Sequence, residues 1–358
     1  MSPSSERISL LGGLGRLLGS RRRRTLLLSF SAYGKLPVYK DFLRLGMSGG
    51  EAQAFRQWLD RGFSRFWEAD EVCSAHHPIA GHGFVLGWSG APGRLAGCLW
   101  GSHDQGELRR FPFALFVALP RGVGPLAELH VLAQLMPAAA ALRLQVAGAA
   151  GAEEFYRQVR AATLTLRVES QGELLEQLRR EAGEITVGSF AASLFGGPED
   201  EAAARKGSAL LAFLGRVRAR AGAAAPPFAC RLPVSPLLPA LRQAEIWGVA
   251  LGHGSAPLNC LLPVALAARE DDGVAAGVTA GVTAGMTAGM ALFARDLRPE
   301  DVLVLHPDPP HYEHAEDLRR DVPRLPDHPP ADRSLVDELL ARPLAALLDP
   351  GVLASLGG

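Results

Sequence analysis

Apolar residues in the first third of the chain are spaced to form a strand, a long helix and then three more strands. Residues 25–32, TLLLSFSA, form a strand-like apolar run. The runs at 83–89 and 95–101, joined by GAPGR, predict a hairpin, and residues 111–120 predict the next strand. Within residues 47–70, large apolar residues recur at helical spacing and predict an amphipathic helix with one buried face: Phe55, Trp58, Leu59, Phe63, Phe66 and Trp67.

The rest of the chain mixes helical and strand-like patterns. Residues 126–148 are rich in Leu and Ala and predict a helix with a break or kink at Pro137. Residues 153–182 predict one or two charged amphipathic helices, and 199–220 predict another. Because strands and helices are interspersed in this way, the fold class is α/β or α+β.

The last third predicts further strands and two helices. A helix should begin at Ser235, with Pro236 in its first turn. Residues 333–348 should form a final helix, with Leu335, Leu339, Leu340 and Leu344 on one face. Four apolar runs predict strands: 228–234, 259–267, 291–297 and 301–306.

Composition narrows the class of protein. The chain has 358 residues, of which 48% are hydrophobic, so it can bury a sizeable core. Lys plus Arg and Asp plus Glu both number 37, so no net charge attracts nucleic acid or an anionic membrane. The four cysteines contain no CxxC pair and fit buried thiols of a reducing cytoplasm: Cys73, Cys98, Cys230 and Cys260.

Two segments do not fit a packed domain. Residues 1–26 carry the run Arg21–Arg24 and are interpreted as a basic disordered leader, with a weak membrane or acidic-partner contact as the alternative. Residues 273–294 repeat Gly, Thr and Ala without a charge and are interpreted as a surface loop. A packed Gly/Ala helix and a membrane span are the alternatives, although large apolar side chains are few.

Histidines gather in two stretches but form no convincing catalytic set. Imidazole and carboxylate groups at such spacing could hold a divalent metal, which leaves a metal-dependent hydrolase or phosphatase as an alternative function. The second stretch is Pro-rich and has no helix to fix the ligand geometry, so a solvated linker is the better interpretation. The residues concerned are His76, His77 and His82 in the first stretch, and His306, Asp308, His311 and His314 in the second.

Three blocks of sequence together resemble a known family. YGKLPVYKDFLRLGM (33–47), FRQWLDRGF (55–63) and SHDQGELRRFPFAL (102–115) are similar to signature segments of the TagF family, also called ImpM, of bacterial type VI secretion. The chain departs from that pattern where Lys40 and Leu108 replace glycines. The resemblance is clear over 27–120. The matching residues are Tyr33, Gly34, Lys35, Leu36, Pro37, Asp41, Phe42, Arg44, Trp58, Ser102, Asp104, Arg109, Phe111 and Pro112.

The resemblance implies a fold and a function. The implied fold is an α/β three-layer sandwich, in which helices flank a central mixed or antiparallel sheet. The implied function is that of a cytoplasmic, non-enzymatic repressor that blocks assembly of a type VI secretion system post-translationally. Its partner would be a forkhead-associated scaffold protein, within the threonine-phosphorylation pathway. No cofactor, metal, nucleic acid or integral membrane segment is implied, and a structural part of the secretion machine is the alternative.

The domain organisation follows from the resemblance and the composition together. Residues 1–26 are the leader, 27–305 the TagF-like domain, and 306–358 a Pro-rich linker with a C-terminal amphipathic helix. We expect the repeat at 273–290 and the tail to be dispensable for folding, because neither offers a large apolar face. The leucine stripe of the last helix could nevertheless dock on the domain.

The opening motif predicts a charged corner at one end of the sheet. The loops after residues 34 and 101 should meet there and bring together Lys35, Asp41, Asp104 and Arg109. Phe42 should insert into the core behind them and leave the charged groups at the surface. Two interpretations stay open, since charge-assisted hydrogen bonds serve both: the cluster ties two loops together, or it is a recognition surface.

Overall fold

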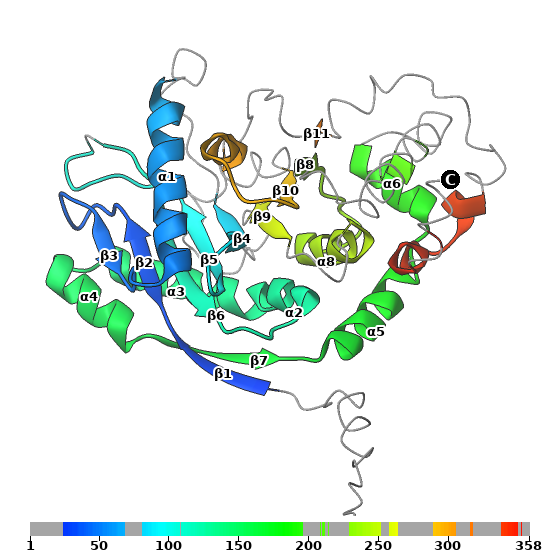
Figure 1. Ribbon diagram of the computed structural model, residues 1–358, viewed down its shortest axis with the longest axis horizontal. Coiled ribbons are helices and arrows are strands. Elements are labelled where there is room, and N and C mark those ends of the chain that lie inside the picture. The colour runs from blue at the N-terminus through cyan, green and yellow to red at the C-terminus, as the bar shows by residue number, and fades with distance from the viewer. Residues whose placement is uncertain are drawn as a thin grey trace, which may run out of the picture.

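The computed structural model describes most of the sheet and the helices around it (Figure 1). The described ranges are 24–68, 81–195 apart from 108, 229–251, 258–263, 289–305 and 338–349, with short pieces at 208–214, 316–317 and 352. The predicted leader up to residue 23 and the repeat at 273–288 lie outside them. Most of the predicted helix at 199–220 and the histidines of both stretches other than His82 also lie outside.

A single large sheet forms the centre of the molecule. Eight strands follow one another as antiparallel neighbours, and a ninth, β11, joins the far edge parallel to β8. The order is β3 (Leu43–Leu45), β2 (Ser31–Gly34), β6 (Phe113–Leu119), β5 (Arg94–Trp100), β4 (His82–Gly87), β9 (Asn259–Pro263), β10 (Met290–Phe293), β8 (Ala229–Leu232) and β11 (Glu316–Asp317). The central strands β4 and β5 are buried throughout, because helices or 3-10 turns cover both faces of the sheet.

One face of the sheet packs against helix α1 (Gly50–Glu68) and the 3-10 helix η4 (Pro299–Leu305). Aromatic rings fill this interface. The Phe55 ring lies 5.1 Å from that of Phe84 and 5.2 Å from that of Phe116, measured between centroids. Trp58 is 3% exposed, and its Nε1 donates to the carbonyl oxygen of Arg298 at 2.9 Å. The aromatic face predicted for this helix is therefore confirmed at the residues whose side chains are described.

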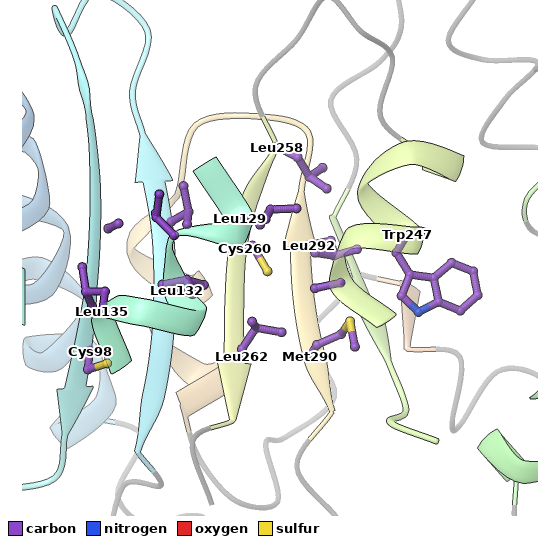
Figure 2. Packing of buried hydrophobic residues seen from close by; sticks show 14 of the residues in the cluster. Cys98, Leu129, Leu132, Leu135, Trp247, Leu258, Cys260, Leu262, Met290 and Leu292 are labelled. Carbon is purple, nitrogen blue, oxygen red and sulfur yellow. The ribbon is translucent and has the colours of Figure 1, made fainter. Parts of the chain in front are cut away.

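The opposite face packs against α2 (Pro125–His130), α3 (Leu132–Ala147) and α8 (Ala240–Leu251). Figure 2 shows Leu132 and Leu135 of α3 beside Cys98 of β5, with Trp247 of α8 at the far end of the cluster. By length and composition alone, Pro125–Ala147 could cross a membrane. Its buried leucines pack on the sheet, as those of a core helix do.

A two-stranded ribbon lies outside α3. Strand β1 (Arg24–Ser29) pairs with β7 (Thr163–Val168) in antiparallel register and continues through the buried Phe30 into β2 of the main sheet. The side-chain amide of Gln134 on α3 bonds both backbone groups of Arg167, at 2.8 and 3.0 Å. The ribbon is therefore fastened to the helical layer (Figure 1).

Three more helices and the tail complete the second layer. They are α4 (Ala152–Ala161), α5 (Gln171–Ala182) and α6 (Val187–Phe195), and the tail contributes the 3-10 helix η6 (Leu344–Leu348). The tail lies against α5 and α8, and the Leu344 amide donates to the carbonyl oxygen of Ile185. Leu339, Leu344, Leu347 and Leu348 are all at most 2% exposed. The tail therefore docks on the domain, which the sequence had left as the alternative to a dispensable tail, and Leu339 and Leu344 of the predicted stripe are buried.

The predicted fold class, α/β with helices on both sides of a largely antiparallel sheet, is confirmed. So are the predicted hairpin, the strand after it, and strands within 228–234, 259–267 and 291–297. Two predictions of element type or extent were wrong. Residues 301–305 form the 3-10 helix η4, because the carboxylate of Asp301 accepts the Arg298 amide and closes a turn. The tail helix bends at Pro343 instead of running from 333 to 348.

The prediction of one or two helices over 153–182 is confirmed by α4 and α5, but strand β7, which separates them, was not predicted. Leu164 and Leu166 point inward, and Thr163, Thr165 and Arg167 outward, so the alternation of a strand was present in the sequence. Two helix boundaries also differ from expectation. The helical stretch at 125–147 breaks at Val131 and continues through Pro137. The Ser235 hydroxyl accepts the Leu237 amide in a turn, and α8 begins only after Pro239.

Candidate functional site

The predicted corner exists at one end of the sheet. The loop between β2 and β3 and the loop between β5 and β6 leave the same end and lie side by side (Figure 1). The Gln105 amide donates to the Tyr39 carbonyl oxygen at 3.2 Å, and the Arg109 guanidinium donates to that of Lys40 at 2.7 Å. We call residues 35–42 and 102–111 the corner.

Gly34 allows the two loops to start this close together. It pairs with Phe113 across β2 and β6, and its φ of +131° lies outside the range of L side chains. A Cβ atom built on Gly34 would lie 2.0 Å from the carbonyl oxygen of Pro112. Gly34 of the first matching block therefore contacts the backbone of Pro112, which belongs to the Phe-Pro pair of the third block.

A buried ion pair holds the corner together. Lys35 Nζ lies 3.3 Å from Asp104 Oδ2, and both residues are at most 3% exposed. Arg109 approaches the same oxygen through Nε at 2.8 Å, and its backbone amide donates to Asp104 Oδ1 at 3.2 Å. The Arg109 side chain stays 60% exposed. One carboxylate thus serves an inner lysine and an outer arginine.

The environment of Asp104 favours its charged form. Burial alone would raise the pKa of its carboxyl, but the hydrogen bonds from Arg109 and Lys35 outweigh burial and lower the pKa to about 2. Asp104 is therefore ionised in the folded protein at every pH above that value. The ionised form is what a buried lysine needs as its partner, because an unpaired buried charge is strongly unfavourable.

This pKa predicts how stability depends on pH. The folded-state pKa lies below the unfolded value of about 3.9, so the stabilisation by Asp104 is complete above that pH. It is lost as the pH falls toward about 2. We expect wild type to have a higher free energy of unfolding than Asp104→Asn. This difference should be largest at pH 7 and should shrink below about pH 4. Urea titrations over this range measure it, and a difference that stays constant down to about pH 2.5 would refute the assignment.

An aromatic cluster supports the charged groups from below. The Phe42 ring stacks on Tyr33, with centroids 5.7 Å apart, and meets Phe111 edge-on at 4.8 Å. Lys35 Nζ lies 4.8 Å from the centre of the Phe42 ring, within cation–π distance. The Tyr33 hydroxyl donates to Asp60 of α1. Burial and that hydrogen bond raise the pKa of Tyr33, so the phenol stays protonated.

The structure corrects the sequence-based picture of the corner in two respects. Asp41 does not join the cluster: its carboxylate is exposed and accepts the amide of the next residue, Phe42, at 2.7 Å. The charged groups are not all at the surface, because Lys35 and Asp104 are buried while Phe42 is only half-buried. Lys35 directly follows the buried end of β2, and the loop at 102–111 lies beside it, so the pair is enclosed.

The other predicted residues take supporting positions. Leu36, Trp58 and Phe111 are buried, Pro37 is exposed, and the Ser102 carbonyl oxygen accepts the Phe111 amide at 3.0 Å. The sequence analysis missed Asp60 and Tyr156. The Tyr156 hydroxyl accepts the backbone amide of Arg44 on the edge strand β3 at 3.2 Å. Tyr156 lies in a helix far from the motif. Asp60 lies in the second matching block, but its contact with Tyr33 depends on how α1 packs, which no spacing pattern reveals.

The histidine stretches yield no metal site within the described residues. His82 is buried in β4. Across the described parts of the chain, no three His, Cys, Asp or Glu side chains gather into a metal-binding group.

A separate polar network joins α2, α5 and α8, where Glu245 lies 2.9 Å from His130 and 2.6 Å from Arg242, and Arg242 lies 2.8 Å from Glu181. It fastens three helices together.

The fold and the corner define an α/β domain whose most distinctive polar feature is a loop-to-loop contact. Comparison with known families identifies it further. Residues 31–162 match the family model described as the TagF N-terminal domain, type VI secretion system-associated. Residues 31–162 are therefore similar to a TagF N-terminal domain, and the resemblance seen in the opening motif is confirmed. The matched range contains the whole corner.

A solved structure and the curated proteins were also compared. The crystal structure of PA0076 from Pseudomonas aeruginosa PAO1 is similar over 37% of this chain, with 21% sequence identity and a TM-score of 0.31. The similar region spans 62% of PA0076, which is less than two thirds of that chain. None of the curated proteins matches this chain.

Proposed function

We propose that this protein is a cytoplasmic, post-translational repressor of type VI secretion system assembly. In this proposal it acts by binding, without catalysis, and its partner is a forkhead-associated scaffold protein of the secretion system. The observation that carries the proposal is the match of residues 31–162 to the type VI secretion system-associated TagF N-terminal domain. The corner lies within that range and offers a surface of paired charges and aromatic rings, which suits protein recognition.

The test uses the bacterium that encodes the protein. Deleting the gene should increase export of type VI substrates while the transcripts of the secretion genes stay unchanged, because repression is post-translational. Supplying the full chain from a plasmid should reverse the increase. An unchanged level of export in the deletion strain, or a reduced one, would refute repression, and a reduced level would favour a structural part of the machine.

The partner is tested separately. The purified full chain, immobilised through an added tag, should retain the purified forkhead-associated protein of the same secretion system. A matched column carrying heat-denatured chain is the control. Failure to retain that protein, together with increased export in the deletion strain, would keep repression and exclude this partner.

A further inference from the structure

We propose that the outer face of the corner binds an acidic segment of a partner protein. The outer face consists of Lys40, Phe42, Arg44 and Arg109. The proposal deepens the proposed function, because it names the surface and the chemistry by which the domain would recognise its partner.

Some charged groups of the corner are buried, and others are exposed to solvent. The inner lysine, Lys35, and the carboxylate of Asp104 are both buried and neutralise each other. Arg109 shares Asp104 through Nε and donates to the Lys40 carbonyl oxygen through Nη2, and its side chain is 60% exposed. Of these three charged residues, Arg109 is therefore the one that solvent reaches.

Two further cations stand on the outer face without a carboxylate partner. Lys40 and Arg44 are exposed, and among the described residues neither side chain has a carboxylate within ion-pair distance. Lys40 is linked to Arg109, because its backbone carbonyl oxygen accepts a hydrogen bond from the Arg109 guanidinium. The Arg44 guanidinium carbon lies 5.6 Å from the centre of the Phe42 ring.

Nearby carboxylates do not cancel this charge. The exposed charged residues of 35–45 and 102–111 are four cations and two carboxylates: Lys40, Arg44, Arg109 and Arg110, against Asp41 and Glu107. The carboxylate of Asp41 accepts the Phe42 amide and keeps its negative charge, so four cations against two carboxylates leave a surplus of two positive charges. Asp60, on the neighbouring helix, accepts the Tyr33 hydroxyl. A cationic surplus on a chain whose total charge is zero marks this face as an anion-attracting surface.

Phe42 adds an apolar anchor at the centre of the outer face. Its ring is half-buried, and the Arg44 guanidinium carbon lies 5.6 Å from the ring centre. A partly exposed aromatic ring beside arginines is the composition typical of binding hot spots. The partner segment should therefore carry an apolar residue among its acidic ones.

The edge of the sheet does not provide an alternative way of binding. Strand β3 is the outermost strand beside the corner, and an extended peptide could in principle add to it. The outward-facing amide of Arg44 is already bonded to the Tyr156 hydroxyl of α4. Recognition by side chains is therefore favoured over strand addition.

The test measures binding of a labelled peptide by fluorescence anisotropy. The probe is a short peptide of glutamates around a central pair of leucines, and its control has glutamine at every glutamate. The variant is the full chain with Lys40→Glu and Arg44→Glu, both at exposed positions. The matched control is Arg157→Glu on α4, whose side chain is 75% exposed.

Wild type and Arg157→Glu should bind the glutamate peptide at low salt. The affinity of the double variant for this peptide should be lower by a factor of about ten or more. Binding should weaken sharply at about 0.5 M salt, because the charges are exposed. Equal binding by the double variant, or equal binding of the glutamine peptide, would overturn the proposal. If the double variant melts lower than wild type, the single change Lys40→Gln is used and should weaken binding severalfold.

This experiment can fail independently of the proposed function. The peptide assay uses purified protein and does not depend on secretion. A deletion strain with increased export, together with no peptide binding, would leave repression standing and remove the outer face from it. Peptide binding in a protein whose deletion changes nothing would support the surface and remove the repressor function.

Discussion

Ending the chain after Leu305 is expected to leave a protein that does not fold stably. Four leucines of the tail are at most 2% exposed against α5 and α8: Leu339, Leu344, Leu347 and Leu348. Burying each such side chain contributes about 1.5–3 kcal/mol. Their sum approaches the whole free energy of unfolding of a typical domain, about 5–15 kcal/mol. The tail therefore belongs energetically to the domain.

Soluble yield and thermal melting of the truncated chain test this directly. Leu344→Ala in the full chain is the graded control and should cost about 2–5 kcal/mol, because it leaves a cavity in the same interface. A truncated protein that is soluble and melts cooperatively near the wild-type temperature would contradict the packing of the tail. It would instead support the sequence-based expectation that residues after 305 are dispensable.

Replacing Trp58 by alanine is expected to cost about 3–5 kcal/mol of folding free energy. The indole is 3% exposed between α1 and the sheet. Its Nε1 donates to Arg298, just before η4, so the change both opens a cavity and leaves a backbone carbonyl without its donor. Both effects act on the interface that joins residues 50–68 to residues 298–305.

Urea unfolding measures the effect, with Leu27→Ala as the control. Leu27 is 71% exposed, and its replacement should change stability by no more than about 0.5 kcal/mol. If Trp58→Ala is as stable as Leu27→Ala, then α1 does not pack as described. The result also tests whether α1 and η4 unfold together, since Trp58 lies in α1 and bonds the residue just before η4.

Most helices and strands whose apolar residues recur at a regular spacing were predictable. Those that depend on contacts with residues distant in the sequence were not. The aromatic face of α1 and the hairpin of β4 and β5 follow from spacing alone. Strand β7 was missed because charged helical residues flank its short alternating run on both sides. Residues 301–305 form a 3-10 helix because Asp301 bonds Arg295 and the Arg298 amide, contacts that an apolar run cannot reveal.

The sequence predicted which residues form the candidate site better than it predicted how they are arranged. The motif brought together Lys35, Asp104 and Arg109, and the structure places Lys35 and Arg109 around the carboxylate of Asp104. Burial could not be predicted, because it depends on how the loop at 102–111 wraps over Lys35. Asp41 was placed wrongly for a local reason: its side chain is satisfied by the amide of the next residue.

The division of the corner into inner and outer charges is tested most directly in the native bacterium. The deletion strain is complemented with the full chain carrying Lys40→Glu and Arg44→Glu, or with Arg157→Glu as the control. Export of type VI substrates and the amount of soluble chain are measured in the same cultures. We expect both variants to accumulate like wild type, Arg157→Glu to restore repression, and the double variant to leave export at the level of the deletion strain. Full repression by a normally abundant double variant would contradict the account.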